Sequence, residues 1–145
     1  MEISVLGPLR VTVDGRPVAL PAKQRKLLAI LALQPNRAVS ADRLIVALWG
    51  EDASPTAIKT LQSHVFQLRR LLAPDASAGA PRPTIITDGR GYRLDVDPMA
   101  IDARQFEQLF EQGRVAATAE PHRALALVKA AMGLWRAPGT ADVGD

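Results

Sequence analysis

One stretch of the chain, residues 56–70, concentrates side chains of the kinds that bind nucleic acids. Arg and Lys bind guanine edges or phosphates, Gln reads adenine, and apolar carbons meet the methyl group of thymine. At 100° per residue, a helix over this stretch gathers such groups on one side: Thr56, Lys59, Ser63, Phe66, Gln67 and Arg70. This mixture favours a helix in the major groove of DNA. The alternative is an ordinary solvated face, on which one exposed aromatic ring needs no explanation.

A guanidinium at a turn is a second candidate for DNA contact. Arg90 lies in the sequence Asp-Gly-Arg-Gly between two strand-like runs, and such a tip would place it in a narrow, electronegative minor groove. The alternative is a polar turn residue, and the neighbouring Asp88 weakens the functional interpretation. Four further cations either touch phosphates or are plain surface charges: Lys23, Arg25, Lys26 and Arg37.

Trp49 and His64 each have a structural interpretation beside the functional one. The indole N–H of Trp49 can donate to a phosphate oxygen, or its ring can anchor the core. His64 lies at the edge of the apolar side of the helix over residues 56–70. This position favours a partly buried structural role over a base contact.

The sequence contains no residue cluster typical of an enzyme. Cysteine is absent, and the two histidines, His64 and His122, lie in different predicted domains. No His, Asp or Glu group has the spacing of a metal site. The Asp-Gly-Arg-Gly segment is too short to cradle a phosphate, and a strand-like run follows it rather than a helix. We therefore expect neither catalysis nor a cofactor.

Composition and charge indicate a globular protein with a basic first part. The chain has 145 residues, of which 48% are hydrophobic, enough for a core without disulfides. Residues 1–97 hold 13 Lys and Arg against 9 Asp and Glu (+4), and the rest hold 5 against 6 (−1), which sums to the net charge of +3. The basic excess is a mild signal for a polyanionic partner. No stretch has the length of a membrane span or the pattern of a signal peptide, so we expect a cytoplasmic protein without membrane contact.

Residues 1–97 are predicted to form an α+β winged helix-turn-helix domain. Alternating residues and an Asp-Gly turn predict an N-terminal antiparallel sheet of two or three strands. Three helices follow, which begin at Pro21, at Ser40 and at Ser54-Pro55. The third helix should run to Leu72 and bury five residues: Ile58, Leu61, Val65, Leu68 and Leu72. Residues 73–83 predict a loop, and residues 84–96 predict the C-terminal hairpin.

Residues 98–145 predict the N-terminal part of a second, all-α domain. Two amphipathic helices joined at Glu120-Pro121 should form a helical hairpin like one repeat of a TPR solenoid. Phe106, Leu109, Phe110 and Gly113 would line one helix, and Leu127, Val128, Ala131 and Leu134 the other. Such a unit cannot bury its apolar face alone, so we interpret this domain as incomplete.

Several stretches taken together resemble the Streptomyces antibiotic regulatory protein (SARP) family. They are "ISVLGPLRV", "LPAKQRKLLAILAL", "LIVALWGEDASPTAIKTLQSHVFQLRRLL", "GYRL", and "DARQFEQL" followed by "ALALVKAAMGLWR". Each motif is modest, but their order is specific and covers essentially the whole chain. The resemblance implies an OmpR/PhoB-type winged helix followed by a TPR-like bacterial transcriptional activation domain.

The resemblance also implies a function and its site residues. It implies a transcription activator that binds direct repeats of double-stranded DNA as a head-to-tail pair and recruits RNA polymerase with its sigma subunit, for secondary-metabolite genes. The polymerase would face the loop formed by Glu51, Asp52, Ala53 and Ser54. The third helix would be the recognition helix, which puts seven residues at or near DNA: Trp49, Lys59, Thr60, Ser63, His64, Gln67 and Arg70. Phe66 and Arg90 join this set on the residue pattern alone.

The sequence departs from the family pattern at two residues, and one alternative function remains open. Lys59 stands where the family has Arg, which loses bidentate geometry, and Asp88 in the hairpin weakens a minor-groove contact. The rival is a protein-interaction scaffold that uses the winged fold and TPR-like helices without reading DNA. Salt separates the two, because binding driven by phosphates weakens steeply as salt rises.

Overall fold

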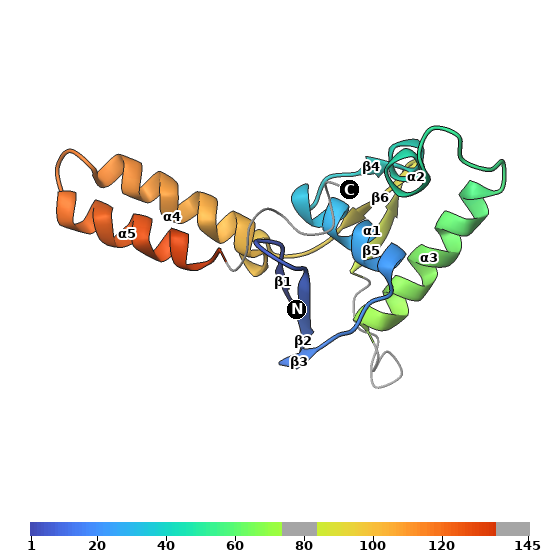
Figure 1. Cartoon of the computed structure of the whole chain (residues 1–145), viewed down its shortest axis with the longest axis horizontal. Coiled ribbons are helices and arrows are strands. Elements are labelled where there is room, and N and C mark those ends of the chain that lie inside the picture. Colours follow the sequence, from blue (N-terminus) through green and yellow to red (C-terminus); the bar gives the residue numbers. More distant parts are fainter. Residues whose placement is uncertain (74–83, 136–145) are drawn as a thin grey trace.

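The computed structural model describes residues 1–73 and 84–135 of the chain. Its two parts lie end to end along the longest axis of the molecule, with a winged helix-turn-helix unit at one end and a helical hairpin at the other (Figure 1). This α+β architecture confirms the predicted fold class. The predicted loop over residues 73–83 and the chain's last ten residues fall almost entirely outside the described residues.

The N-terminal sheet has three antiparallel strands in the order β1-β2-β3: β1 (Glu2–Ser4), β2 (Arg10–Val13) and β3 (Arg16–Pro17). Asp14 and Gly15 connect β2 to β3 with φ values of 52° and 76°. Positive φ at both central residues is what a tight hairpin turn of the primed type needs, and Asp-Gly supplies it. The Asp-Gly turn signal in the sequence is therefore confirmed.

Three helices enclose the main core: α1 (Ala22–Leu33), α2 (Ala41–Trp49) and α3 (Ala57–Leu72). The predicted boundaries of α2 are confirmed, since the hydroxyl of Ser40 accepts from the N–H of Arg43 and Gly50 ends the helix at φ 84°. The buried side of α3 carries Leu61, Val65, Leu68 and Leu72, each at most 3% exposed. These residues pack in one cluster with leucines of α1 and α2 and with Ile85 and Leu94 of the wing.

Two predictions for the start of α3 were wrong. The helix begins at Ala57, because the Ser54 hydroxyl accepts from the N–H of Thr56 and closes a separate turn before the helix. Ile58, expected in the core, is 45% exposed. It lies in the first turn of α3, where it lines a surface groove beside the wing instead of packing on α1.

The wing is a three-stranded antiparallel sheet in the order β4-β6-β5: β4 (Val39–Ser40), β6 (Gly91–Leu94) and β5 (Ile85–Asp88). The predicted hairpin is confirmed, and its loop consists of Gly89 and Arg90. Strand β4 was not predicted, because two residues between a loop and a helix carry no periodic signal. Gly91 makes the pairing possible, since a Cβ there would lie 2.1 Å from the carbonyl oxygen of Val39.

The helical hairpin consists of α4 (Asp102–Ala116) and α5 (Pro121–Gly133), preceded by the short helix η2 (Pro98–Ala100). The predicted join at Glu120-Pro121 is confirmed. Gly113 brings the helices close, because a Cβ there would lie 3.1 Å from a methyl group of Val128. Phe110, expected inside the hairpin, is 49% exposed. It stacks on Phe106, with ring centres 6.1 Å apart.

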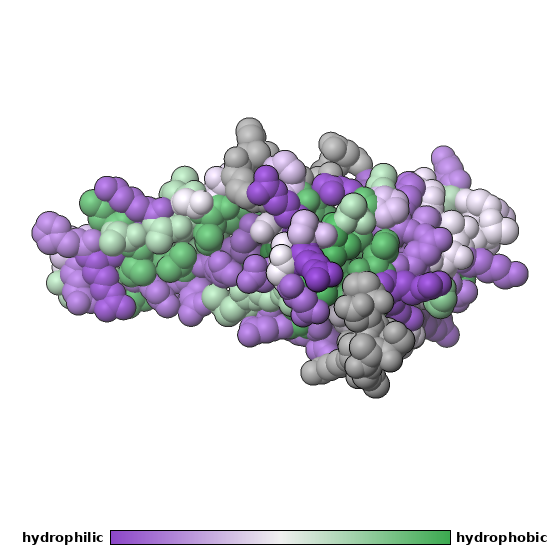
Figure 2. All heavy atoms as spheres, turned by 90° about the horizontal axis from the view of Figure 1, so that it is seen from below, coloured by the Kyte–Doolittle hydropathy of each residue, from purple (hydrophilic) through white to green (hydrophobic). Residues whose placement is uncertain are grey.

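The helical hairpin carries several exposed apolar side chains. Figure 2 shows apolar residues along the hairpin, while the opposite end is mostly hydrophilic. Val115, Leu125 and Met132 are 69%, 54% and 58% exposed. None of the helices in the described residues is long and apolar enough to cross a membrane.

Candidate nucleic-acid interface

The outer face of α3 is exposed along its whole length. Lys59, Ser63, Phe66, Gln67 and Arg70 are all exposed, as the helical pattern predicted. Phe66 is 59% exposed, and the guanidinium carbon of Arg70 lies 5.8 Å from its ring centre. This distance is within the range of a cation–π contact. The ring therefore supports the Arg70 side chain on the face that would meet DNA.

Thr60 lies beside this face, and its hydroxyl is hydrogen-bonded within the helix. Its hydroxyl donates to the carbonyl oxygen of Thr56 at 3.2 Å. The side chain is exposed, so its hydroxyl oxygen keeps the capacity to accept a further hydrogen bond. A phosphate oxygen cannot donate, which makes Thr60 a weaker candidate for phosphate contact than Lys59.

Gln67 and His64 are both tied to a buried residue of α1. Gln24 is 2% exposed, and its Nε2 lies 3.0 Å from Nδ1 of His64. The same Nε2 donates to Oε1 of Gln67. Gln24 was not predicted from the sequence, although its helical spacing to Leu27 and Leu28 puts a polar group on the buried side of α1.

His64 has a structural role in this arrangement, as a partner of Gln24. Burial lowers the pKa of His64 from its ordinary value of 6.5, and the positive charge of Lys23 lowers it further. A neutral ring can accept from Gln24 at Nδ1 only with its proton on Nε2. The partly buried structural role predicted for His64 is thus what the structure shows, whereas a DNA contact stays a prediction.

Trp49 is half-buried between two helices. Its ring centre lies 5.8 Å from that of His64 and 5.5 Å from Nζ of Lys23. Nζ of Lys23 also donates to the carbonyl oxygen of Leu48. Lys23 is consequently part of the α1–α2 contact rather than a plain surface charge, and Trp49 packs against the core as its structural interpretation predicted.

The wing is fastened to α3 by Arg69. Its Nε donates to the carbonyl oxygen of Ile85 at 2.8 Å, and its Nη2 donates to the hydroxyl of Thr87 at 3.0 Å. Its guanidinium carbon lies 6.0 Å from the ring centre of Tyr92. The helical pattern predicted an outward position for Arg70 but no partner for Arg69, which α3 turns toward the wing.

Arg90 lies at the wing tip with an exposed side chain. Its carbonyl oxygen accepts from the N–H of Ala41, which joins the tip to the start of α2. Asp88, the residue that weakened this candidate, pairs with Arg93 at 3.6 Å. The positive charge of Arg93 offsets the carboxylate, so Asp88 opposes a minor-groove contact less than the sequence suggested.

A groove of about 500 Å³ separates α3 from the wing tip. Gln62 and Ile58 line it from α3, Asp42 from α2, and Arg90 and Tyr92 from the wing. The groove is open to solvent, and its lining combines a carboxylate with a guanidinium. This composition does not single out an anion-binding pocket.

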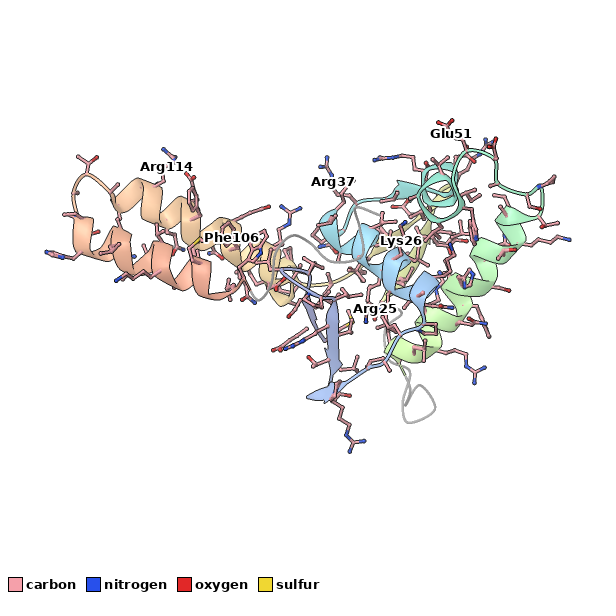
Figure 3. The ribbon with its side chains drawn as sticks, in the orientation of Figure 1. Arg25, Lys26, Arg37, Glu51, Phe106 and Arg114 are labelled. Carbon is pink, nitrogen blue, oxygen red and sulfur yellow. The ribbon has the colours of Figure 1, made fainter. Side chains whose placement is uncertain are left out.

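The other candidate groups fall into separate regions. Figure 3 shows Glu51 at the connection between α2 and α3, and Arg37 beyond the end of α1 that lies away from α3. Glu51, Asp52 and Ser54 are exposed, and Ala53 is half-buried. The Arg25 guanidinium donates to the carbonyl oxygen of Leu9 at 3.3 Å. Arg25 thus braces the N-terminal sheet, and Arg37 is remote from the α3 face.

No group of three potential metal ligands occurs within residues 1–73 and 84–135. The described site consists of hydrogen-bonding groups, cations and one ring on a rigid helix, without a convergent titratable cluster. This arrangement suits recognition of a surface through hydrogen bonds and charge.

Comparison with known proteins shows which family the chain belongs to. The family described as "Transcriptional regulatory protein, C terminal" matches residues 15–94, more than half of the chain, and the family described as "Bacterial transcriptional activator domain" matches residues 101–145. The transcriptional regulator RedD of Streptomyces coelicolor is 33% identical over the whole chain, and the regulatory protein DnrI of Streptomyces peucetius is 36% identical over 99% of it. The chain belongs to the SARP family of transcription regulators.

A solved structure is also similar to the chain, and the chain matches only part of each relative. The chain matches Mycobacterium tuberculosis EmbR, solved in complex with a low-affinity phosphopeptide, with a TM-score of 0.88 and 35% identity over 98% of the chain. This match covers 38% of EmbR, and the chain spans 42% of RedD and 54% of DnrI. The chain is thus similar to about half or less of each SARP-type relative.

Proposed function

We propose that this chain is the DNA-binding part of a transcription activator, with α3 as the helix that enters the major groove. The observation that carries the proposal is the outer face of α3, where Lys59, Gln67 and Arg70 are exposed around a ring. A buried core on the other side of the helix makes that face rigid. A rigid face with Arg, Gln and Lys suits direct readout of base edges.

The other contacts of the proposed complex follow from this orientation. Lys59 and Thr60 lie near the start of α3 and would meet phosphates or bases there, while Arg90 at the wing tip would reach the adjacent minor groove. Trp49 would donate its indole N–H to a phosphate oxygen. His64 would act by its contacts with Gln24 and Trp49 rather than by contacting a DNA base.

Assembly and activation are further parts of the proposal. The family membership supports binding to direct repeats as a head-to-tail pair, recruitment of RNA polymerase with its sigma subunit, and control of secondary-metabolite genes. The exposed acidic residues Glu51 and Asp52 would face the polymerase, together with Ala53 and Ser54. We also propose that the winged-helix domain spans residues 1–97 and the activation domain begins at residue 98.

Selection of duplexes from a random library by the 145-residue chain tests this function. The proposal predicts enrichment of a sequence that occurs as a direct repeat with a spacing near one helical turn. Binding to the enriched duplex should also fall steeply between 50 and 200 mM salt. Recovery of no preferred sequence would contradict the proposal.

A protein-interaction scaffold is the second candidate, and one observation favours it. Phe110, Val115, Leu125 and Met132 expose apolar surface on the hairpin, which is typical of a surface that contacts protein. This role predicts that the winged-helix end binds DNA weakly and without preference. The same selection experiment therefore decides between the two candidates.

A further inference from the structure

A buried hydrogen-bond cluster lies directly behind the outer face of α3. Gln24 projects from α1 between two residues of α3, His64 and Gln67, and contacts both. Gln24 is almost fully buried, at 2% exposed, whereas Gln67 is exposed. The cluster therefore links an internal side chain to a side chain on the proposed DNA-binding face.

The hydrogen-bonding capacity of Gln24 fixes the orientation of Gln67. The amino group of Gln24 has two N–H groups, and His64 Nδ1 and Gln67 Oε1 accept one each. Because the amino group of Gln24 faces Nδ1 of His64 at 3.0 Å and can only donate, Nδ1 accepts and the proton of the neutral ring is on Nε2. The second N–H then meets the oxygen of Gln67. With this oxygen turned inward, the Nε2 amino group of Gln67 is the part left toward solvent.

We propose that Gln24 is a positioning residue that decides which base Gln67 reads, by holding the Gln67 oxygen inward and its amino group outward. This inference rests on the proposed function, with α3 in the major groove. A side chain that presents donors pairs with acceptor edges, and guanine offers O6 and N7 while thymine offers O4. Gln67 then reads guanine or thymine. This differs from the usual bidentate contact of Gln with adenine, which needs both the oxygen and the amino group.

The inference makes opposite predictions for two substitutions of Gln24. In Gln24→Glu, the carboxylate only accepts, so His64 must carry a proton on Nδ1, and the amino group of Gln67 turns inward and its oxygen outward. The base preference then moves to adenine or cytosine, which present amino donors. In Gln24→Leu, Gln67 has no internal partner and rotates freely, so the preference at this one position flattens. If Gln24 had a purely structural role, its substitution would weaken binding to every duplex equally.

A surface substitution tests the same logic without disturbing the interior. In Gln67→Glu, one carboxylate oxygen accepts from Gln24 and the other faces the groove. An outward acceptor favours cytosine, whose N4 donates. Gln67→Ala removes the contact and serves to identify the base pair concerned. Gln62, an exposed glutamine of the same helix outside the proposed contact set, gives the matched control Gln62→Ala.

The experiment measures Kd for sets of four duplexes that differ at a single base pair of the sequence selected by the wild-type chain. Wild type should prefer guanine or thymine about tenfold at the pair where Gln67→Ala shows no preference. Gln24→Glu and Gln67→Glu should each reverse that order, and Gln62→Ala should keep it. Thermal unfolding shows whether each variant is folded, and Gln67→Glu remains decisive if Gln24→Leu does not fold.

Three results would overturn the inference. Adenine preference in the wild type would mean that the Gln67 oxygen faces the groove. An unchanged order in Gln24→Glu and Gln67→Glu would mean that Gln24 does not set the readout. If Gln67→Ala keeps the wild-type preference at every base pair, Gln67 does not read DNA, while the proposed function stands. If the wild type selects no sequence, the proposed function itself fails.

Discussion

The carboxylate of Asp102 accepts a hydrogen bond from the backbone N–H of Val5 at 2.7 Å. Its second oxygen accepts from the N–H of Leu6 at 3.3 Å, and the carboxylate is buried, with Asp102 7% exposed. A parallel bridge between Ile3 and Ile101 lies beside it. The first turn of α4 is therefore attached to the N-terminal sheet, which holds the helical hairpin against the winged-helix part.

Removal of this carboxylate should destabilise the junction. Asp102→Ala leaves two buried N–H groups without an acceptor, so we expect the free energy of unfolding to fall by about 2–3 kcal/mol. Asp102→Asn keeps one acceptor oxygen and should lose less. Urea unfolding of both variants measures the difference. Equal stability of Asp102→Ala and wild type would show that the hydrogen bonds of Asp102 do not stabilise the junction.

Two neighbouring arginines should affect stability to very different extents when substituted. Arg69→Leu breaks the bonds to Ile85 and Thr87 and should cost about 1.5–3 kcal/mol of stability. Arg70→Ala removes an exposed side chain and should change stability by less than about 0.5 kcal/mol. Chemical denaturation gives both values. The assignment of Arg69 to the fold fails if the two losses are alike.

Gly91 is the most sensitive glycine of the wing. In Gly91→Ala, the new Cβ would meet the carbonyl of Val39, so β4 and β6 must separate and we expect a loss of about 3 kcal/mol or more. Gly133→Ala is the control, because nothing lies within 4 Å of a Cβ there and helix propensity favours Ala by less than about 1 kcal/mol. Thermal unfolding compares them, and a tolerated Gly91→Ala would mean that β4 pairs differently.

The stability of the chain should depend on pH through His64. Its pKa in the folded chain lies below the ordinary value of 6.5, by burial first and by Lys23 second. As the pH falls below about 6.5, the unfolded chain takes up this proton before the folded chain does, and the free energy of unfolding decreases until the folded pKa is passed.

Urea unfolding at pH 8, 6.5 and 5 measures this contribution. The stability difference between wild type and His64→Gln should be larger at pH 8 than at pH 5. His122→Gln, which changes an exposed histidine of α5, is the control for the substitution itself. A difference between wild type and His64→Gln that is constant over this range would contradict the assignment of a neutral His64 to the fold.

The main elements of the fold could be predicted because their signals are local. Asp14-Gly15, Ser40 and Gly50 each favour one backbone conformation whatever surrounds them, and the structure has those turns and caps. The periodicity of α3 also predicted its buried side, apart from Ile58. That residue follows the helical period but lies in a first turn beyond the reach of α1, and periodicity carries no information on where a neighbour ends.

The candidate site could be predicted only on its exposed side. Lys59, Ser63 and Arg70 are exposed as the helical pattern predicted, since exposure depends on the angle around the helix. The roles of Gln24 and Arg69 depend on which side chains meet across separate elements. The spacing along one helix does not encode such meetings, and the start of α3 was misplaced because Ser54 caps a turn as readily as a helix.

One binding measurement tests the central claim most directly. Fluorescence anisotropy would compare wild type, Arg70→Ala and Arg114→Ala on the selected duplex and on a scrambled one, at two salt concentrations. Arg114 is the matched control, since it is an exposed arginine of the hairpin, paired with Glu111 and far from α3 (Figure 3). We predict that Arg70→Ala loses about 1–3 kcal/mol on the selected duplex alone, while Arg114→Ala binds like wild type. Equal, weak binding of all three proteins to both duplexes would contradict the claim that the outer face of α3 reads DNA.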